Sequence, residues 1–161
     1  YPDENLVRLV AKELQRYNSA SELKAIDIGC GSGRHISFLK NSGITEVYGT
    51  DNSFNALELC REIDHNHLIN CDTRKLSLQN EQFDISVAWG SLHYSTKPEI
   101  EPMISEIKRI TKTGGAFFAT LRSANDTYLK NGKHLGNNTW QTGLDDLTGT
   151  FVSFYDEVEL I

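Results

Sequence analysis

The stretch AIDIGCGSGRHISFLK, residues 25–40, decides the fold of this chain. A short apolar run leads into three glycines, Gly29, Gly31 and Gly33, and a helical pattern follows directly. A glycine-rich turn between a strand and a helix lets a ligand approach the backbone closely, and the helix N-terminus adds free N–H groups. The stretch therefore predicts a nucleotide-binding turn but leaves open which nucleotide it holds.

The spacing of these glycines is G-x-G-x-G. The dinucleotide fingerprint G-x-G-x-x-G would need a glycine at position 34, where Arg34 stands, and the phosphate-loop pattern G-x-x-x-x-G-K-[ST] is absent. Nicotinamide and flavin cofactors are therefore disfavoured. A cation in the first turn of a helix opposes the helix dipole, so an anion is expected near Arg34. An anionic group of the ligand or a neighbouring aspartate would serve, and a solvated surface arginine is the alternative.

Strand and helix patterns alternate on both sides of this turn. We expect helices over residues 3–18, 34–41, 54–63 and 97–110, and strands over residues 24–28, 45–50, 67–70, 83–89 and 116–122, the last one after a break at Gly114-Gly115. Such alternation is typical of βαβ units with right-handed crossovers. The expected fold is therefore α/β and Rossmann-like: a doubly wound, mostly parallel sheet with helices on both faces.

The chain is expected to form a single domain, residues 1–161, with its core at residues 24–122. Residues 123–154 are polar and irregular, and a loop of this length is expected to act as a lid or substrate segment. Residues 155–161 look like the start of another helix. Since a doubly wound sheet would continue from that helix into a further strand, we expect C-terminal strands to be missing from this chain.

Composition narrows the function. The net charge of −6 disfavours nucleic acid as a partner. No apolar run approaches the roughly 20 residues that span a bilayer, and no signal peptide opens the chain. The three cysteines show no C-x-x-C spacing, so we expect reduced thiols and a cytoplasmic protein. His65 and His67 form an H-x-H pair without further ligands in suitable spacing, so no metal is expected.

Two acids follow the next strands. Asp51 stands at the end of the second strand, about 20 residues after the glycine turn, where an acid accepts hydrogen bonds from ribose hydroxyls. Asp72 follows the third strand and could meet an exocyclic amine of a base. The carboxyl ends of parallel strands share one sheet edge, where ligands bind in such folds. The sequence therefore predicts a nucleoside site at this edge.

Five segments now stand in a characteristic order: AIDIGCGSGRH, VYGTDNS, NCDTRKLSL, FDISVAWGSLHY and EIKRITKTGGAFFATLR. Together they resemble the class I S-adenosylmethionine-dependent methyltransferases over about residues 1–122. The small-molecule branch of that family is echoed further on by GNNTWQT and FYDEVEL. Methyltransferases acting on amino groups of DNA bases or glutamine often carry [DN]-P-P-[YF] after the fourth strand, whereas this chain has W-G-S-L-H-Y at residues 89–94.

This resemblance implies that the chain is an enzyme with S-adenosylmethionine as cofactor and S-adenosylhomocysteine as product. The glycine turn would hold the methionine part, Asp51 the ribose, and Asn52, Asp72 and Thr73 the adenine. The chain would pass the sulfonium at Trp89 and Gly90. The expected cofactor residues are Tyr1, Asp27, Gly29, Cys30, Gly31, Gly33, Arg34, Asp51, Asn52, Asp72, Thr73, Trp89 and Gly90.

For the reaction, we expect in-line transfer of the methyl group to a small-molecule acceptor, mainly through positioning. His93 is the candidate general base, with a pocket-lining or structural histidine as the alternative. Tyr94, Tyr128 and Trp140 are candidate substrate contacts, and Tyr128 and Trp140 could equally anchor their loop. A non-catalytic module that binds cofactor or partner is the other hypothesis for the whole chain. The sequence leaves the acceptor and the oligomeric state open.

Overall fold

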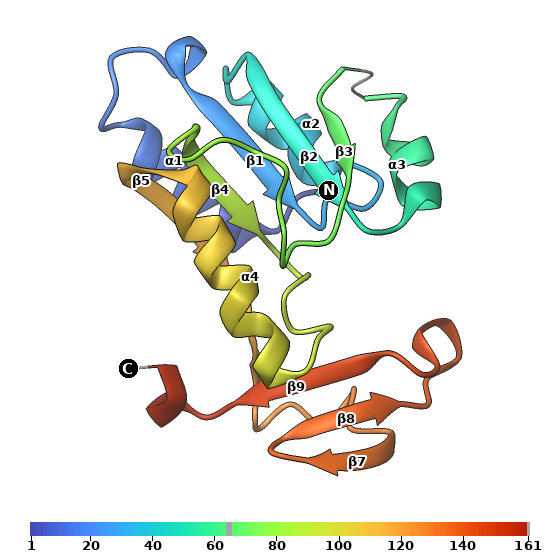
Figure 1. Ribbon diagram of the computed structural model, residues 1–161. Helices are drawn as coiled ribbons and strands as arrows, with labels where there is room; N and C mark the ends of the chain where they lie inside the picture. Colours follow the sequence, from blue (N-terminus) through green and yellow to red (C-terminus); the bar gives the residue numbers. More distant parts are fainter. Residues whose placement is uncertain (64–65, 161) are drawn as a thin grey trace.

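The computed structural model describes residues 1–63 and 66–160, and it contains two sheets (Figure 1). The larger sheet has the strand order β3-β2-β1-β4-β5, and all its neighbouring strands are parallel. This confirms the Rossmann-like α/β fold. Its strands are β1 (Lys24–Ile28), β2 (Glu46–Asp51), β3 (Leu68–Asn70), β4 (Phe83–Ala88) and β5 (Thr111–Ala119).

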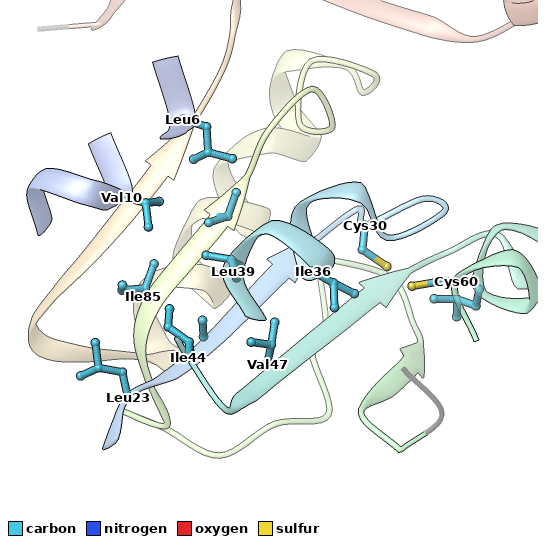
Figure 2. Packing of buried hydrophobic residues seen from close by; sticks show 13 residues of the cluster. Leu6, Val10, Leu23, Cys30, Ile36, Leu39, Ile44, Val47, Cys60 and Ile85 are labelled. Atoms are coloured by element: carbon cyan, nitrogen blue, oxygen red, sulfur yellow. The ribbon is translucent and has the colours of Figure 1, made fainter. Parts of the chain in front are cut away.

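Helices cover both faces of this sheet because alternate strand residues are apolar on each side. On one face, Ala25 of β1 packs with buried residues of three helices: α1 (Glu4–Leu14), α2 (Arg34–Asn41) and α3 (Phe54–Cys60). Figure 2 shows this cluster, with Leu6 and Val10 of α1 and Ile36 and Leu39 of α2 among its members. On the other face, Ile26 and Ile28 meet Ile107 and Ile110 of α4 (Lys97–Ile110).

The helix boundaries follow local signals in the sequence. The Asp3 side chain accepts a hydrogen bond from the Asn5 N–H and so caps the N-terminus of α1. At the start of α4, the Thr96 N–H donates to Glu99 Oε2 at 3.0 Å, as the T-x-x-E spacing predicts. A short 3₁₀ turn, η1 (Ala20–Glu22), leads from α1 toward β1. No helix in the described part of the chain is long and apolar enough to cross a membrane.

Several element boundaries were wrongly expected. α1 ends at Leu14 and not at residue 18, α3 ends at Cys60 and not at residue 63, and the fifth strand runs from Thr111 to Ala119 instead of over 116–122. The Gly114-Gly115 pair does not precede the fifth strand but lies within it, since β5 already begins at Thr111. Its pairing with β4 shifts between Phe83↔Thr111 and Ile85↔Ala116, and Gly114 has a φ of 81°. The glycines therefore form a bulge that lets the strand continue.

Residues 123–154 hold a small second sheet instead of the expected irregular loop. Its order is β6-β9-β8-β7, and its apolar centre consists of Leu129, Val152 and Phe154. The hairpin β7–β8 turns through Asn137 and Asn138, both at positive φ, which is the backbone that a two-residue hairpin turn requires. The strands are β6 (Arg122–Ser123), β7 (Gly132–Gly136), β8 (Thr139–Thr142) and β9 (Phe151–Tyr155), with a 3₁₀ turn η2 (Asp145–Leu147) between β8 and β9.

The expected helix over 155–161 is also different in the structure. Tyr155 still belongs to β9, and a 3₁₀ turn, η3 (Glu157–Leu160), follows it. None of the three cysteines, all of them within the described residues, forms a disulfide, and Cys30 and Cys60 are buried.

Candidate cofactor site

The glycine turn after β1 has the backbone that only glycine adopts easily. Gly29, Gly31 and Gly33 have φ angles of 70°, 54° and 87°. A Cβ on Gly29 would lie 2.4 Å from the Ser91 Cβ, and one on Gly33 would lie 2.5 Å from the Cys60 Sγ. A Cβ on Gly31 would meet nothing within 4 Å. Packing therefore requires the outer glycines, while the middle glycine borders open space that a ligand could fill.

Asp51 at the end of β2 holds this turn. Its Oδ2 accepts a hydrogen bond from the Gly31 N–H at 2.9 Å, and its Oδ1 accepts one from the Ser53 N–H at 2.8 Å. The Gly29 and Cys30 N–H groups donate to the Thr50 carbonyl at 2.8 and 2.9 Å. The carboxylate is therefore fixed beside the glycine turn at the carboxyl edge of the sheet, as the sequence predicts.

Two cavities meet at this edge. The first, of about 260 Å³, extends from the glycine turn past Asp51 toward α4. The second, of about 270 Å³, lies over the glycine turn itself. Gly29 and Gly90 line both cavities, so the two are neighbours along this edge. The first is lined by Gly29, Asp51, Asn52, Thr73, Gly90, Ser91, Leu92, Tyr94, Ser95 and Met103, and the second by Gly29, Cys30, Gly31, Ser32, Arg34, His35, Trp89 and Gly90.

Arg34 is an exposed residue in the lining of the second cavity. Its guanidinium is 4.0 Å from the position that a Cβ would take on Gly90. Arg34 and Ser32 also line a third hollow, whose lining includes the fully exposed Tyr1. Arg34 is therefore placed as a cation at the mouth of the second cavity, with Tyr1 as a more distant neighbour.

Asp27, in β1 just before the glycine turn, is not among the residues that line either cavity. Its carboxylate is buried, and within the described residues neither of its oxygens has a hydrogen-bond partner. The His35 ring is a close neighbour, with its Nδ1 3.8 Å from Asp27 Oδ2. Burial raises the pKa of the Asp27 carboxyl, and His35 offsets part of this increase. Gly33 likewise serves packing, against Cys60 and Ile63.

Asp72 is engaged elsewhere. Its carboxylate forms a bidentate ion pair with the Arg74 guanidinium and also accepts the Arg74 N–H. The side chain and backbone of Arg74 lower the pKa of the Asp72 carboxyl. Asp72 is not among the residues lining the first cavity, whereas its neighbour Thr73 is.

His93 is not among the residues lining either cavity. Its ring is buried, and burial, followed by the charge of Arg122, lowers its pKa to about 4. The centre of the His93 ring lies 4.4 Å from the centre of the Tyr94 ring, and Tyr94 does line the first cavity. Tyr94 and Trp140 pack against the same apolar centre of the small sheet, whereas Tyr128 is 72% exposed.

Six further lining residues were not expected. Ser91, Leu92 and Ser95 follow β4 at the carboxyl edge of the sheet, so their position in the chain could have indicated them. Ser32 and His35 flank Gly33 and Arg34, while Met103 comes from the middle of α4 and has no local sequence signal. Across residues 1–63 and 66–160, no group of three or more potential ligands could hold a metal ion. His65 of the H-x-H pair lies outside the described residues.

Comparison with known proteins agrees with this geometry. A family model described as "Methyltransferase domain" matches residues 25–115, more than half of the chain. The sterol 4-C-methyltransferase strm-1 of Caenorhabditis elegans is 26% identical in an alignment of 140 residues that covers 82% of this chain. This chain spans only 41% of the length of that relative.

Solved structures show the same fold. An S-adenosylmethionine-dependent methyltransferase from Methanosarcina mazei superposes with a TM-score of 0.77 at 20% identity, covering 94% of this chain and 79% of its own. One from Mesorhizobium loti gives a TM-score of 0.58 at 23% identity, covering 71% and 54%. With the family match over the glycine turn and the sheet, the chain belongs to the methyltransferase-domain family of class I S-adenosylmethionine-dependent methyltransferases.

Proposed function

We propose that this chain binds S-adenosylmethionine in the two neighbouring cavities and transfers its methyl group to a small-molecule acceptor. The observation that carries the proposal is the pairing of a fixed carboxylate with an open glycine turn. Asp51 lies against Gly31, and a Cβ on Gly31 would stand in empty space. This arrangement accommodates a nucleoside that comes close to the backbone and brings no phosphate.

The adenosine part would occupy the first cavity. Asp51 offers carboxylate lone pairs to the two ribose hydroxyls, and Asn52 and Thr73 lie along the same cavity, where the base would rest. The methionine part would lie over the glycine turn in the second cavity, with its carboxylate toward Arg34. Because Gly29 and Gly90 line both cavities, the sulfonium, which connects the two parts of the cofactor, would lie beside these two glycines.

When bound, the cofactor supplies an already activated methyl group, so the chain needs mainly to bind, orient and exclude water. Holding two reactants in line can contribute several kcal/mol to the rate. The mechanism does not require a base from the protein. His93 is buried, neutral at ordinary pH and not itself a lining residue, so it is better suited to supporting Tyr94 than to accepting a proton.

Several observations support a small-molecule acceptor. The negative net charge and the W-G-S-L-H-Y segment disfavour nucleic acid. The matched relative from Caenorhabditis elegans is named as a sterol methyltransferase. Tyr94 lines the first cavity, and Tyr94 and Trp140 both pack against the apolar centre of the small sheet. We propose these two residues as the acceptor contacts. Tyr128 is exposed and separate from them, so we leave it out of the acceptor site.

The test is binding followed by transfer. Titration calorimetry with S-adenosylhomocysteine should show one site per chain, and S-adenosylmethionine with a labelled methyl group should label a compound in a metabolite extract. Binding without labelling would favour the alternative, a non-catalytic module that holds cofactor or partner. If neither compound binds, the proposed function is wrong.

A further inference from the structure

One wall of the first cavity is an irregular segment, residues 90–95, which we call the wall segment. Gly90, Ser91, Leu92, Tyr94 and Ser95 all line the cavity. The wall segment belongs to no helix or strand, so its course depends on individual hydrogen bonds.

Its first half is fastened to the main sheet. The Gly90 N–H donates to Thr120 Oγ1 at 2.7 Å, and the Ser91 hydroxyl donates to the Ile28 carbonyl at 2.9 Å. These bonds fix the wall where it crosses the ends of β1 and β5.

Its second half is fastened to the small sheet by one residue. Ser153 of β9 donates its N–H to the His93 carbonyl at 2.9 Å and its hydroxyl to the Ser95 carbonyl at 2.6 Å. Ser153 is fully buried, and its hydroxyl also lies 3.1 Å from Thr139 Oγ1. Between these two anchor points, the Tyr94 side chain packs against the small sheet's apolar centre.

We propose that Ser153 is a positioning residue for the cofactor: it holds the wall segment against the small sheet and so sets the shape of the first cavity. Ser153 is not among the residues that line the cavity, and it acts through His93 and Ser95. The inference rests on the proposed function, since it takes the first cavity as the cofactor site.

The test compares two buried serines. Ser153→Ala removes the hydroxyl that reaches Ser95 but keeps the backbone bond to His93. Ser86→Ala is the matched control, because Ser86 is equally buried and its hydroxyl bonds Thr111 within the main sheet, away from the wall. Both variants are compared with the unmodified chain for melting temperature, affinity for S-adenosylhomocysteine and hydrogen exchange of a peptide covering the wall segment.

For Ser153→Ala we expect affinity to fall by about 3- to 10-fold, the effect of one lost hydrogen bond. Exchange in the wall peptide should accelerate by a similar factor, while exchange in β1 and β2 stays unchanged. Ser86→Ala should lower the melting temperature. Its affinity for S-adenosylhomocysteine should stay within twofold of that of the unmodified chain, and hydrogen exchange in the wall peptide should not change.

Unchanged exchange in the wall of Ser153→Ala would overturn the inference, whether or not the cofactor binds. Equal loss of affinity in both variants would also overturn it, because the effect would then be one of general stability. Absence of binding by the unmodified chain would instead count against the proposed function.

Discussion

The Gly31 N–H and the Asp51 carboxylate lie 2.9 Å apart, joining the glycine turn after β1 to the end of β2. Each Asp51 oxygen accepts one backbone N–H, from Gly31 or Ser53, and keeps further lone pairs for a ligand. The residue proposed to bind the ribose therefore also shapes the turn proposed to bind the methionine part. Both halves of the cofactor site depend on this one carboxylate.

Replacing Asp51 by alanine should therefore weaken S-adenosylhomocysteine binding by roughly 10- to 100-fold, since hydrogen bonds to a charged group contribute about 1.5–3 kcal/mol. Calorimetric titration measures the change. Glu58→Ala is the control, because Glu58 is an exposed acid on the neighbouring helix that pairs with Arg61. Equal affinity of Asp51→Ala and the unmodified chain would rule out the ribose assignment.

The glycines at positions 31 and 33 should respond differently to alanine. Both have positive φ, so each substitution costs about 1 kcal/mol of backbone strain. At Gly33 the new methyl would also collide with Cys60 Sγ, so the free energy of unfolding should fall by roughly 2–4 kcal/mol in total. At Gly31 there is no collision, and the methyl would instead occupy ligand space.

Gly31→Ala should therefore stay folded but lose at least about tenfold in S-adenosylhomocysteine affinity. Denaturant unfolding and calorimetric titration of both variants separate the two effects. A Gly31→Ala protein that binds normally would show that the cofactor does not approach this turn.

His93 predicts a pH dependence of stability. Its folded pKa of about 4 is below the ordinary value of 6.5, mainly because the ring is buried. Protonation of His93 therefore favours the unfolded chain. The stability that the neutral buried ring contributes is fully present above pH 6.5 and is lost as the pH falls toward 4. It amounts to about 3 kcal/mol.

In His93→Leu, the unfolding free energy should change less between pH 6.5 and 4.5 than in the unmodified chain. The comparison of the two proteins removes the opposing effect of Asp27, whose raised pKa favours the folded state as pH falls. Denaturant unfolding at several pH values measures the difference. Parallel curves for the two proteins would show that His93 does not cause the dependence.

The parts of the fold that the sequence predicts well are those with local signals. β1 and α2 match their expected ranges, because an apolar run and a positive-φ glycine define their boundary. The small sheet was missed because β6, β7 and β8 are short and mostly polar, although the apolar run of β9 and the Asn137-Asn138 turn were usable signals. Asp72 was expected in the site, but its ion pair depends on Arg74, whose side-chain direction no spacing reveals.

The last prediction concerns Arg34, an exposed cation that lines the second cavity. If Arg34 binds the methionine carboxylate, Arg34→Gln should lower the affinity for S-adenosylhomocysteine by roughly 10-fold, because one charge-assisted contact is lost. 5′-Methylthioadenosine shares the adenosine part and lacks the amino-acid part. Its affinity for Arg34→Gln should therefore stay within twofold of its affinity for the unmodified chain. Calorimetry with both ligands, using Arg8→Gln on the exposed face of α1 as control, makes the comparison. Equal losses of affinity for the two ligands would show that Arg34 maintains the shape of the site and does not bind the carboxylate. No loss for either ligand would show that another group binds the methionine carboxylate.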